Sequence, residues 1–199
     1  MRLNQKANLA VGKEEQIYIQ QVVGSFLCYA RAVDMKVLQA LSEIAVQQEK
    51  STETTMQRVK QFLDYMHTNP NAKIIYYASD MVLNVRSDAS YLSASNARSR
   101  AGGYFFLESL PVNKKDIKLN ENIHILCTIL EHVAASAAEA ELGALFLYAK
   151  EAKVVRLTLL ELGHPTPPIP IHIDNSTAVG IVDSTIKRQR SRSMEMRYF

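Results

Sequence analysis

The N-terminal part of the chain contains three segments in which apolar residues recur every three or four positions. The first of them holds Ile19, Val22, Val23, Phe26, Leu27 and Ala30. This spacing gathers apolar side chains on one face of an α-helix. Asp34 is a suitable N-cap for the second segment, Ser51 or Thr52 suits the third, and Asn69-Pro70-Asn71 ends it. Residues 1–72 are therefore expected to form an all-helical region whose apolar stripes are packing faces.

After this region the pattern changes to short runs of β-branched and aromatic residues. Such runs occur at 73–78, 81–86, 104–107 and 123–130. They predict strands, with 81–86 as the first main strand. Helical spacing returns from about Ser136 to Leu162. A final apolar run at 169–173 predicts one more strand, and Asp174-Asn175-Ser176 can cap a further helix.

The order of these elements predicts an α/β fold. Three consecutive strands can pair as an antiparallel meander, and the strand after the long helix can return parallel to the first of them. Residues 73–199 are thus expected to form a second domain around a mixed sheet, in the order three strands, helix, strand, helix.

Composition narrows the class of protein. The chain has 199 residues, of which 47% are hydrophobic and 22% charged, as expected of a globular protein. Since no stretch of about 18 uncharged apolar residues occurs, neither a transmembrane helix nor a membrane partner is expected. The cysteines, Cys28 and Cys127, form no metal-ligand or disulfide pattern, which favours a reducing compartment.

The net charge of +3 is uninformative, but its distribution is not. Basic residues gather near the C-terminus, opposed there only by Glu195: Lys187, Arg188, Arg190, Arg192 and Arg197. Such a cluster is either a solvated end of the chain or a contact surface for a phosphate backbone.

Acidic residues fall at the ends of the predicted elements. Asp88 follows the first main strand, Asp174 follows the returning strand, and Glu139 and Glu141 lie early in the long helix. Each alone is explained as a turn residue, a cap or a partner of the helix dipole. If the two strands are neighbours, however, Asp88 and Asp174 face one crevice beyond their ends. Carboxylates gathered there raise one another's pKa, and a divalent cation removes that cost.

Four blocks carry a family resemblance. In order they are SDASYLSASNARSRAGGYFFL, SAAEAELGALFLYAKEA, IHIDNSTAVGIV and KRQRSRSMEMRYF. They resemble the ribonuclease H domain of copia-type LTR retrotransposons. The earlier blocks VVGSFLCYARAVD and VKQFLDYMHTNPNAK are similar to the end of the adjoining reverse transcriptase and its connection. The resemblance implies a ribonuclease H-like mixed sheet at 73–199 and a reverse-transcriptase remnant at 1–72.

The resemblance also implies a site of four acids. Asp88 matches the first aspartate of the family, Glu141 the helix glutamate and Asp174 the third acid. Glu139 and Glu141 lie about 200° apart around a helix, so only one should reach the site, and the motif selects Glu141. The fourth acid is usually an aspartate, whereas this chain has Glu195. The sequence stops at Phe199, where the family's last helix continues, so a C-terminally truncated and weakened site is expected.

The implied reaction is hydrolysis of the RNA strand of an RNA–DNA hybrid. Two Mg²⁺ ions about 4 Å apart, or Mn²⁺ in their place, would be held by Asp88, Glu141, Asp174 and Glu195. The residues expected to contact nucleic acid are Ser90, Arg98, Arg100, Asn175, Lys187, Arg188 and Arg190. His172 shares a strand face with Asp174, but a histidine there is more often packed or hydrogen-bonded than catalytic.

Polymerase activity is not expected, because the chain has no Asp-Asp dipeptide for the polymerase metal site. The alternative to a nuclease is a non-catalytic remnant that folds and binds nucleic acid without cleaving it. A pure interaction scaffold is a third class. Partners implied by the resemblance are the hybrid duplex and the remaining parts of the Pol polyprotein. The implied location is the cytoplasm, within a virus-like particle, or the nucleus.

Overall fold

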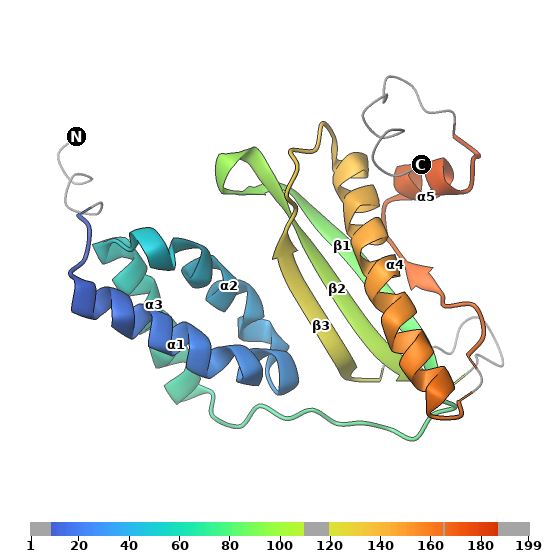
Figure 1. Cartoon of the computed structure of the whole chain (residues 1–199), viewed down its shortest axis with the longest axis horizontal. Coiled ribbons are helices and arrows are strands. Elements are labelled where there is room, and N and C mark those ends of the chain that lie inside the picture. The colour runs from blue at the N-terminus through green and yellow to red at the C-terminus, as the bar shows by residue number, and fades with distance from the viewer. Residues whose placement is uncertain (1–8, 110–119, 165, 187–199) are drawn as a thin grey trace. The chain divides into compact units, whose positions relative to one another are not determined.

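The computed structural model of the chain describes residues 9–109, 120–164 and 166–186 (Figure 1). By its internal contacts the chain divides into two compact units, Met1–Ile74 and Ile75–Phe199. The sequence placed this division between residues 72 and 73. Each unit is described by itself below.

The first unit is helical. It contains α1 (Lys13–Ala32), α2 (Leu38–Gln47) and α3 (Glu53–Thr68), with short 3₁₀ turns before and after α2. The Asp34 side chain accepts a hydrogen bond from the Lys36 N–H at 3.2 Å, and that of Thr52 caps α3. The three predicted helices are confirmed, and their apolar faces form the core of the unit: Ile19, Leu41, Ile44, Val59 and Phe62.

The second unit is a mixed α/β structure. Its sheet has the order β3-β2-β1-β4, built from β1 (Val82–Ala94), β2 (Arg98–Glu108), β3 (Asn122–Ile129) and β4 (Ile171–His172). The first three strands pair antiparallel, while β4 pairs parallel to β1. The predicted meander and parallel return are therefore confirmed. The helix α4 (Ala137–Glu161) makes the crossover, and α5 (Ser176–Val182) follows β4.

The core of this unit lies between α4 and one face of the sheet (Figure 1). Small residues of α4, among them Ala140 and Ala144, let the helix approach β1 and β2 closely. The fully buried Tyr148 ring packs edge-to-face on Phe105, with 6.1 Å between ring centroids. The same ring fills the space beside Gly103, where an added Cβ would lie 2.6 Å from it.

The predicted strand at 73–78 was wrong. This segment is extended but joins no strand ladder. Instead, the Tyr77 N–H and C=O both bond to the side-chain amide of Asn120, and the Tyr76 hydroxyl donates to the Asn122 carbonyl at 2.8 Å. The Asn120 side chain thus supplies the hydrogen bonds to Tyr77 that a neighbouring strand would otherwise make. The pattern of apolar residues does not reveal this substitution of a side chain for a strand.

The prediction that Asp88 follows the end of a strand was wrong on the β2 side of β1. β1 continues to Ala94 because β2 keeps supplying partners, with Asp88 opposite Gly102 and Ser90 opposite Arg100. The segment between the predicted strands at 81–86 and 104–107 is therefore mostly strand, with a turn only at Ser95–Ala97. Only on its β4 side does Asp88 lie beyond the paired residues, since the pairing of β1 with β4 stops at Arg86.

Among the helices of the described residues, none combines the length and the apolar character needed to cross a bilayer.

Candidate metal centre

Sheet register brings the two aspartates together. Val85 pairs with Ile171 and Arg86 with His172 across the parallel strands. Asp88 and Asp174 each follow two residues later, so they leave the paired region at the same level. Neighbouring strands lie about 4.8 Å apart, which brings the two carboxylates within reach of each other. Both side chains are exposed at this edge.

The third carboxylate comes from α4. Ser136 caps this helix by accepting a hydrogen bond from the Glu139 N–H at 3.1 Å, which fixes where the first turn begins. Glu141 then faces the sheet and is only 5% exposed. Its Oε1 accepts a hydrogen bond from the Ala89 N–H at 3.1 Å, so the residue after Asp88 holds the glutamate beside it.

The three acids converge closely. One oxygen each from Asp88, Glu141 and Asp174 can be chosen so that all lie within 4.8 Å of one another. We call these residues the acid triad. Glu141 lies 53 positions after Asp88 and 33 before Asp174, yet the three form one compact group. Exposed acids often cluster without a metal, so the interpretation depends also on the surroundings of Glu141.

Electrostatics at Glu141 favour a cation. Burial raises the pKa of Glu141 from 4.5 to about 7, with Asp88 and Asp174 adding to the rise and the Ala89 N–H opposing it. Its Oε2 is buried and has no hydrogen-bond partner among the described residues. An oxygen left in that state costs free energy, which a bound divalent cation would recover. The donors are all carboxylate oxygens, the ligand type that Mg²⁺ prefers.

The structure distinguishes the two glutamates that helix geometry left open. Glu139 is also buried, but its Oε2 accepts a hydrogen bond from the Ala135 N–H at 2.7 Å, at the start of α4. It therefore serves the helix N-terminus, while Glu141 belongs to the acid triad.

Several predicted site residues lie outside the described residues: Glu195, Lys187, Arg188 and Arg190. Of the others, Ser90 is exposed on β1. Asn175 is the N-cap of α5, because its Oδ1 accepts a hydrogen bond from the Ala178 N–H at 3.0 Å. Asn175 is the residue directly after Asp174, so this cap holds the chain next to Asp174 without any contact with nucleic acid.

The two arginines of the hairpin differ from exposed phosphate-binding residues. Arg100 is only 8% exposed and donates from Nη1 to the Cys127 Sγ at 3.7 Å. Arg98 is half-buried, and its Nε has no hydrogen-bond partner among the described residues. Arg100 in particular has little surface left to offer a duplex.

His172 is hydrogen-bonded, as expected of a structural histidine. Its Nε2 lies 3.4 Å from the Asn84 Oδ1. Burial and then the nearby Arg86 charge lower the pKa of His172, so the neutral imidazole is favoured.

Sequence reasoning missed the Ala89 N–H, which orients Glu141. A backbone N–H donor cannot be recognised from residue type. The only signal in the sequence for this donor is that Ala89 directly follows Asp88.

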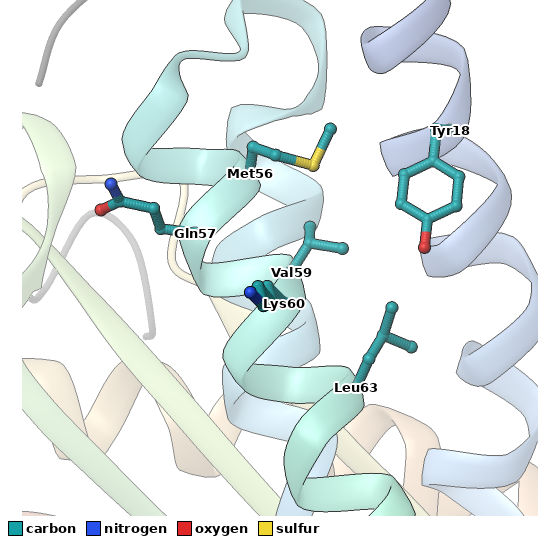
Figure 2. A pocket seen from close by; sticks show the side chains of 6 residues that line it. All are labelled: Tyr18, Met56, Gln57, Val59, Lys60 and Leu63. Atoms are coloured by element: carbon teal, nitrogen blue, oxygen red, sulfur yellow. The ribbon is translucent and has the colours of Figure 1, made fainter.

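The first unit has a groove of another kind (Figure 2). It lies between α1 and α3 and has a volume of about 300 Å³. Its lining is mostly apolar, from Tyr18, Met56, Val59 and Leu63, with Gln57 and Lys60 at the side. Lys60 is the one charged residue in this lining, which contains no carboxylate, histidine or cysteine.

Comparison of the chain with models of protein families and with curated proteins gave no match.

Proposed function

We propose that the second unit is a ribonuclease H-like domain of a copia-type retrotransposon Pol polyprotein. It would hydrolyse the RNA strand of RNA–DNA hybrids. The observation that carries this proposal is the acid triad, together with the buried Oε2 of Glu141, which has no hydrogen-bond partner among the described residues. A strand-edge pair of aspartates joined by a helix glutamate is the arrangement implied by the sequence resemblance, and the strand order agrees with it.

Asp88, Glu141 and Asp174 would hold Mg²⁺, or Mn²⁺ in its place, with Glu195 as the fourth proposed ligand. Bound ions would supply Lewis acidity and lower the pKa of a coordinated water. The chain's own contribution is to hold the carboxylates in position. The Ala89 N–H orients Glu141, and the α5 cap at Asn175 fixes the chain after Asp174. The exposed edge at Asp88 and Asp174 leaves room for a phosphodiester.

The proposed partner is the hybrid duplex, held by backbone contacts that are independent of sequence. Ser90 and Arg98 remain the described candidates for such contacts, together with the basic residues near the C-terminus. Other parts of the polyprotein are further proposed partners. The proposed location is a virus-like particle in the cytoplasm, or the nucleus.

Hybrid cleavage during a Mg²⁺ titration tests the proposal. The parent is expected to cleave the RNA strand feebly and only with metal, while Asp88→Asn should fall to the level seen without metal. Asp80→Asn is the matched control, because Asp80 is exposed, lies outside the acid triad and loses the same charge. Equal cleavage by the parent and Asp88→Asn would show that the site is assigned wrongly.

The second candidate function is binding of hybrids without cleavage. The substitution of Glu195 for the usual aspartate favours it, because catalytic groups must be held to within about 0.5 Å and an added methylene exceeds that. Glu195→Asp should therefore raise the cleavage rate. Hybrid binding without cleavage in either form would support the second candidate. A chain that neither responds to metal nor binds hybrids would be an interaction scaffold.

A further inference from the structure

β1 changes its surroundings after its fourth residue. Its first four residues, Val82 to Val85, are all buried, so both faces of the strand are covered there. From Arg86 onward the exposure alternates, with Arg86, Asp88 and Ser90 exposed. These three side chains lie on one face, since residues two apart on a strand point the same way. We call Arg86, Asp88, Ser90 and the neighbouring Gly102 the polar strip.

Gly102 has no side chain, so the surface of the polar strip is not built up beside the acid triad. It lies opposite Asp88 on β2 and opposite Cys127 on β3, and residues directly opposite in antiparallel pairs share a face. An added Cβ at Gly102 would meet no atom within 4 Å. At Gly103, on the other face, it would meet the Tyr148 ring. The absence of a side chain at Gly102 therefore leaves open space next to Asp88.

Arg86 is the cationic member of the polar strip. Its side chain is exposed, and its guanidinium makes no hydrogen bond to any of the described residues. Its charge acts on Glu108, Tyr104 and His172. A strand rises about 3.3 Å per residue, so the Cα atoms of Arg86 and Asp88 lie about 6.6 Å apart.

We propose that the polar strip is a backbone-binding subsite, in which Arg86 contacts a phosphate and the sugar–phosphate chain crosses Gly102. This rests on the proposed function for the identity of the anion as a nucleic-acid phosphate. A phosphodiester bound at the acid triad places its strand within reach of the arginine side chain. A planar guanidinium is suited to phosphate recognition, because two of its N–H groups can donate to one phosphate. The empty position at Gly102 admits the strand without steric contact.

Binding of an RNA–DNA hybrid over a series of salt concentrations tests Arg86. Ca²⁺ replaces Mg²⁺, since its looser coordination disfavours the chemical step while keeping the carboxylates neutralised. Arg86→Gln should raise Kd about tenfold. It should also reduce the slope of log K against log salt by about 0.9, the loss of one phosphate contact. Lys150→Gln is the matched control, because Lys150 is exposed on α4, which covers the opposite face of the sheet.

Gly102→Val supplies a second measurement. Because nothing lies within 4 Å of the new Cβ, the thermal unfolding midpoint should stay near that of the parent. Hybrid affinity should nevertheless fall about tenfold, with the salt slope unchanged, since space and not charge is lost.

The outcomes separate the two proposals. An unchanged salt slope in Arg86→Gln, or equal reductions in Arg86→Gln and Lys150→Gln, overturns the subsite. A smaller slope in Arg86→Gln alone supports the subsite, even if the parent fails to cleave in Mg²⁺ and the proposed nuclease activity is lost. A parent that binds no hybrid overturns both.

Discussion

Glu141 shows how one side chain connects folding to the proposed chemistry. It is buried, and among the described residues the one backbone donor to its carboxylate is the Ala89 N–H. The sequence indicated that an acid of this helix would face the two strand-end aspartates. Periodicity did not choose between Glu139 and Glu141, because both lie in the first turns of α4. Their hydrogen bonds to Ala135 and Ala89 depend on backbone positions that side-chain patterns do not encode.

The raised pKa of Glu141 predicts how metal-free stability depends on pH. Below pH 4.5 the carboxyl is protonated in both folded and unfolded chains, so it costs nothing. Between pH 4.5 and about 7 only the folded chain keeps the proton, and stability falls as the pH rises. Above that range the full cost remains, at most about 3 kcal/mol of unfolding free energy.

Glu141→Gln removes this cost while still accepting the Ala89 hydrogen bond. In EDTA the variant should therefore be more stable than the parent by about 1–3 kcal/mol at pH 8 and equal to it near pH 4. Urea unfolding at the two pH values measures the difference. Adding Mg²⁺ should stabilise the parent and not the variant. A variant that is less stable than the parent at pH 8 would contradict the burial of an ionised Glu141.

The β1–β2 hairpin shows that the sequence pattern predicted where elements lie better than where strands end. Alternating and apolar runs located the strands, and helical spacing located α4 from Ser136 to Leu162, within a residue of its observed ends. Strand ends were harder, because a strand continues wherever a neighbour offers hydrogen bonds. β1 therefore passes Asp88, and the run at 73–78, whose partner is the Asn120 side chain, is not a strand.

Adjacent glycines of β2 provide a matched pair for stability. Gly103→Ala should destabilise the second unit by about 1–3 kcal/mol, because its Cβ meets the fully buried Tyr148 ring at 2.6 Å. Gly102→Ala should change stability by no more than about 0.5 kcal/mol, because its Cβ meets nothing. Denaturant unfolding of both variants checks this. Equal costs would mean that α4 does not lie on the Gly103 face.

The cap of α5 should influence the acid triad through the chain. Asn175→Ala removes the acceptor of the Ala178 N–H and should cost about 1 kcal/mol. Because the preceding residue is Asp174, the variant should also bind Mn²⁺ about tenfold more weakly. Asn175→Ser keeps a capping oxygen and should restore affinity. Weak binding in both variants would indicate that the asparagine itself, and not the cap, matters.

At the scale of the whole molecule, the chain consists of two units with separate cores. The sequence predicted a division between residues 72 and 73, where helical spacing changes to strand-like spacing, and the structure divides the chain after Ile74. The pattern assigned the segment before β1 to the sheet unit, but as a strand. Its membership depends on three hydrogen bonds that Tyr76 and Tyr77 make with Asn120 and Asn122.

Two shortened chains test this boundary. A chain that begins at Ile75 should unfold cooperatively and bind Mn²⁺ like the parent. A chain that begins at Met81 should be less stable by about 2–3 kcal/mol, since each lost hydrogen bond contributes about 1 kcal/mol and Asn120 is left buried. Thermal and urea unfolding compare them. Equal stability of the two chains would place residues 75–80 outside the second unit.

The brevity of β4 has a consequence for how the protein would come to hold metal. Two ladder residues, with one further hydrogen bond from the Val85 N–H to the Pro170 carbonyl, fasten Asp174 to its neighbours. So few bonds make this the edge of the sheet most ready to detach, and a detached edge leaves only two acids in place. Binding of a cation by the acid triad and pairing of β4 with β1 would then be coupled in one equilibrium. The bound ion would stabilise β4 at the sheet edge, as additional strand hydrogen bonds would in a longer β4.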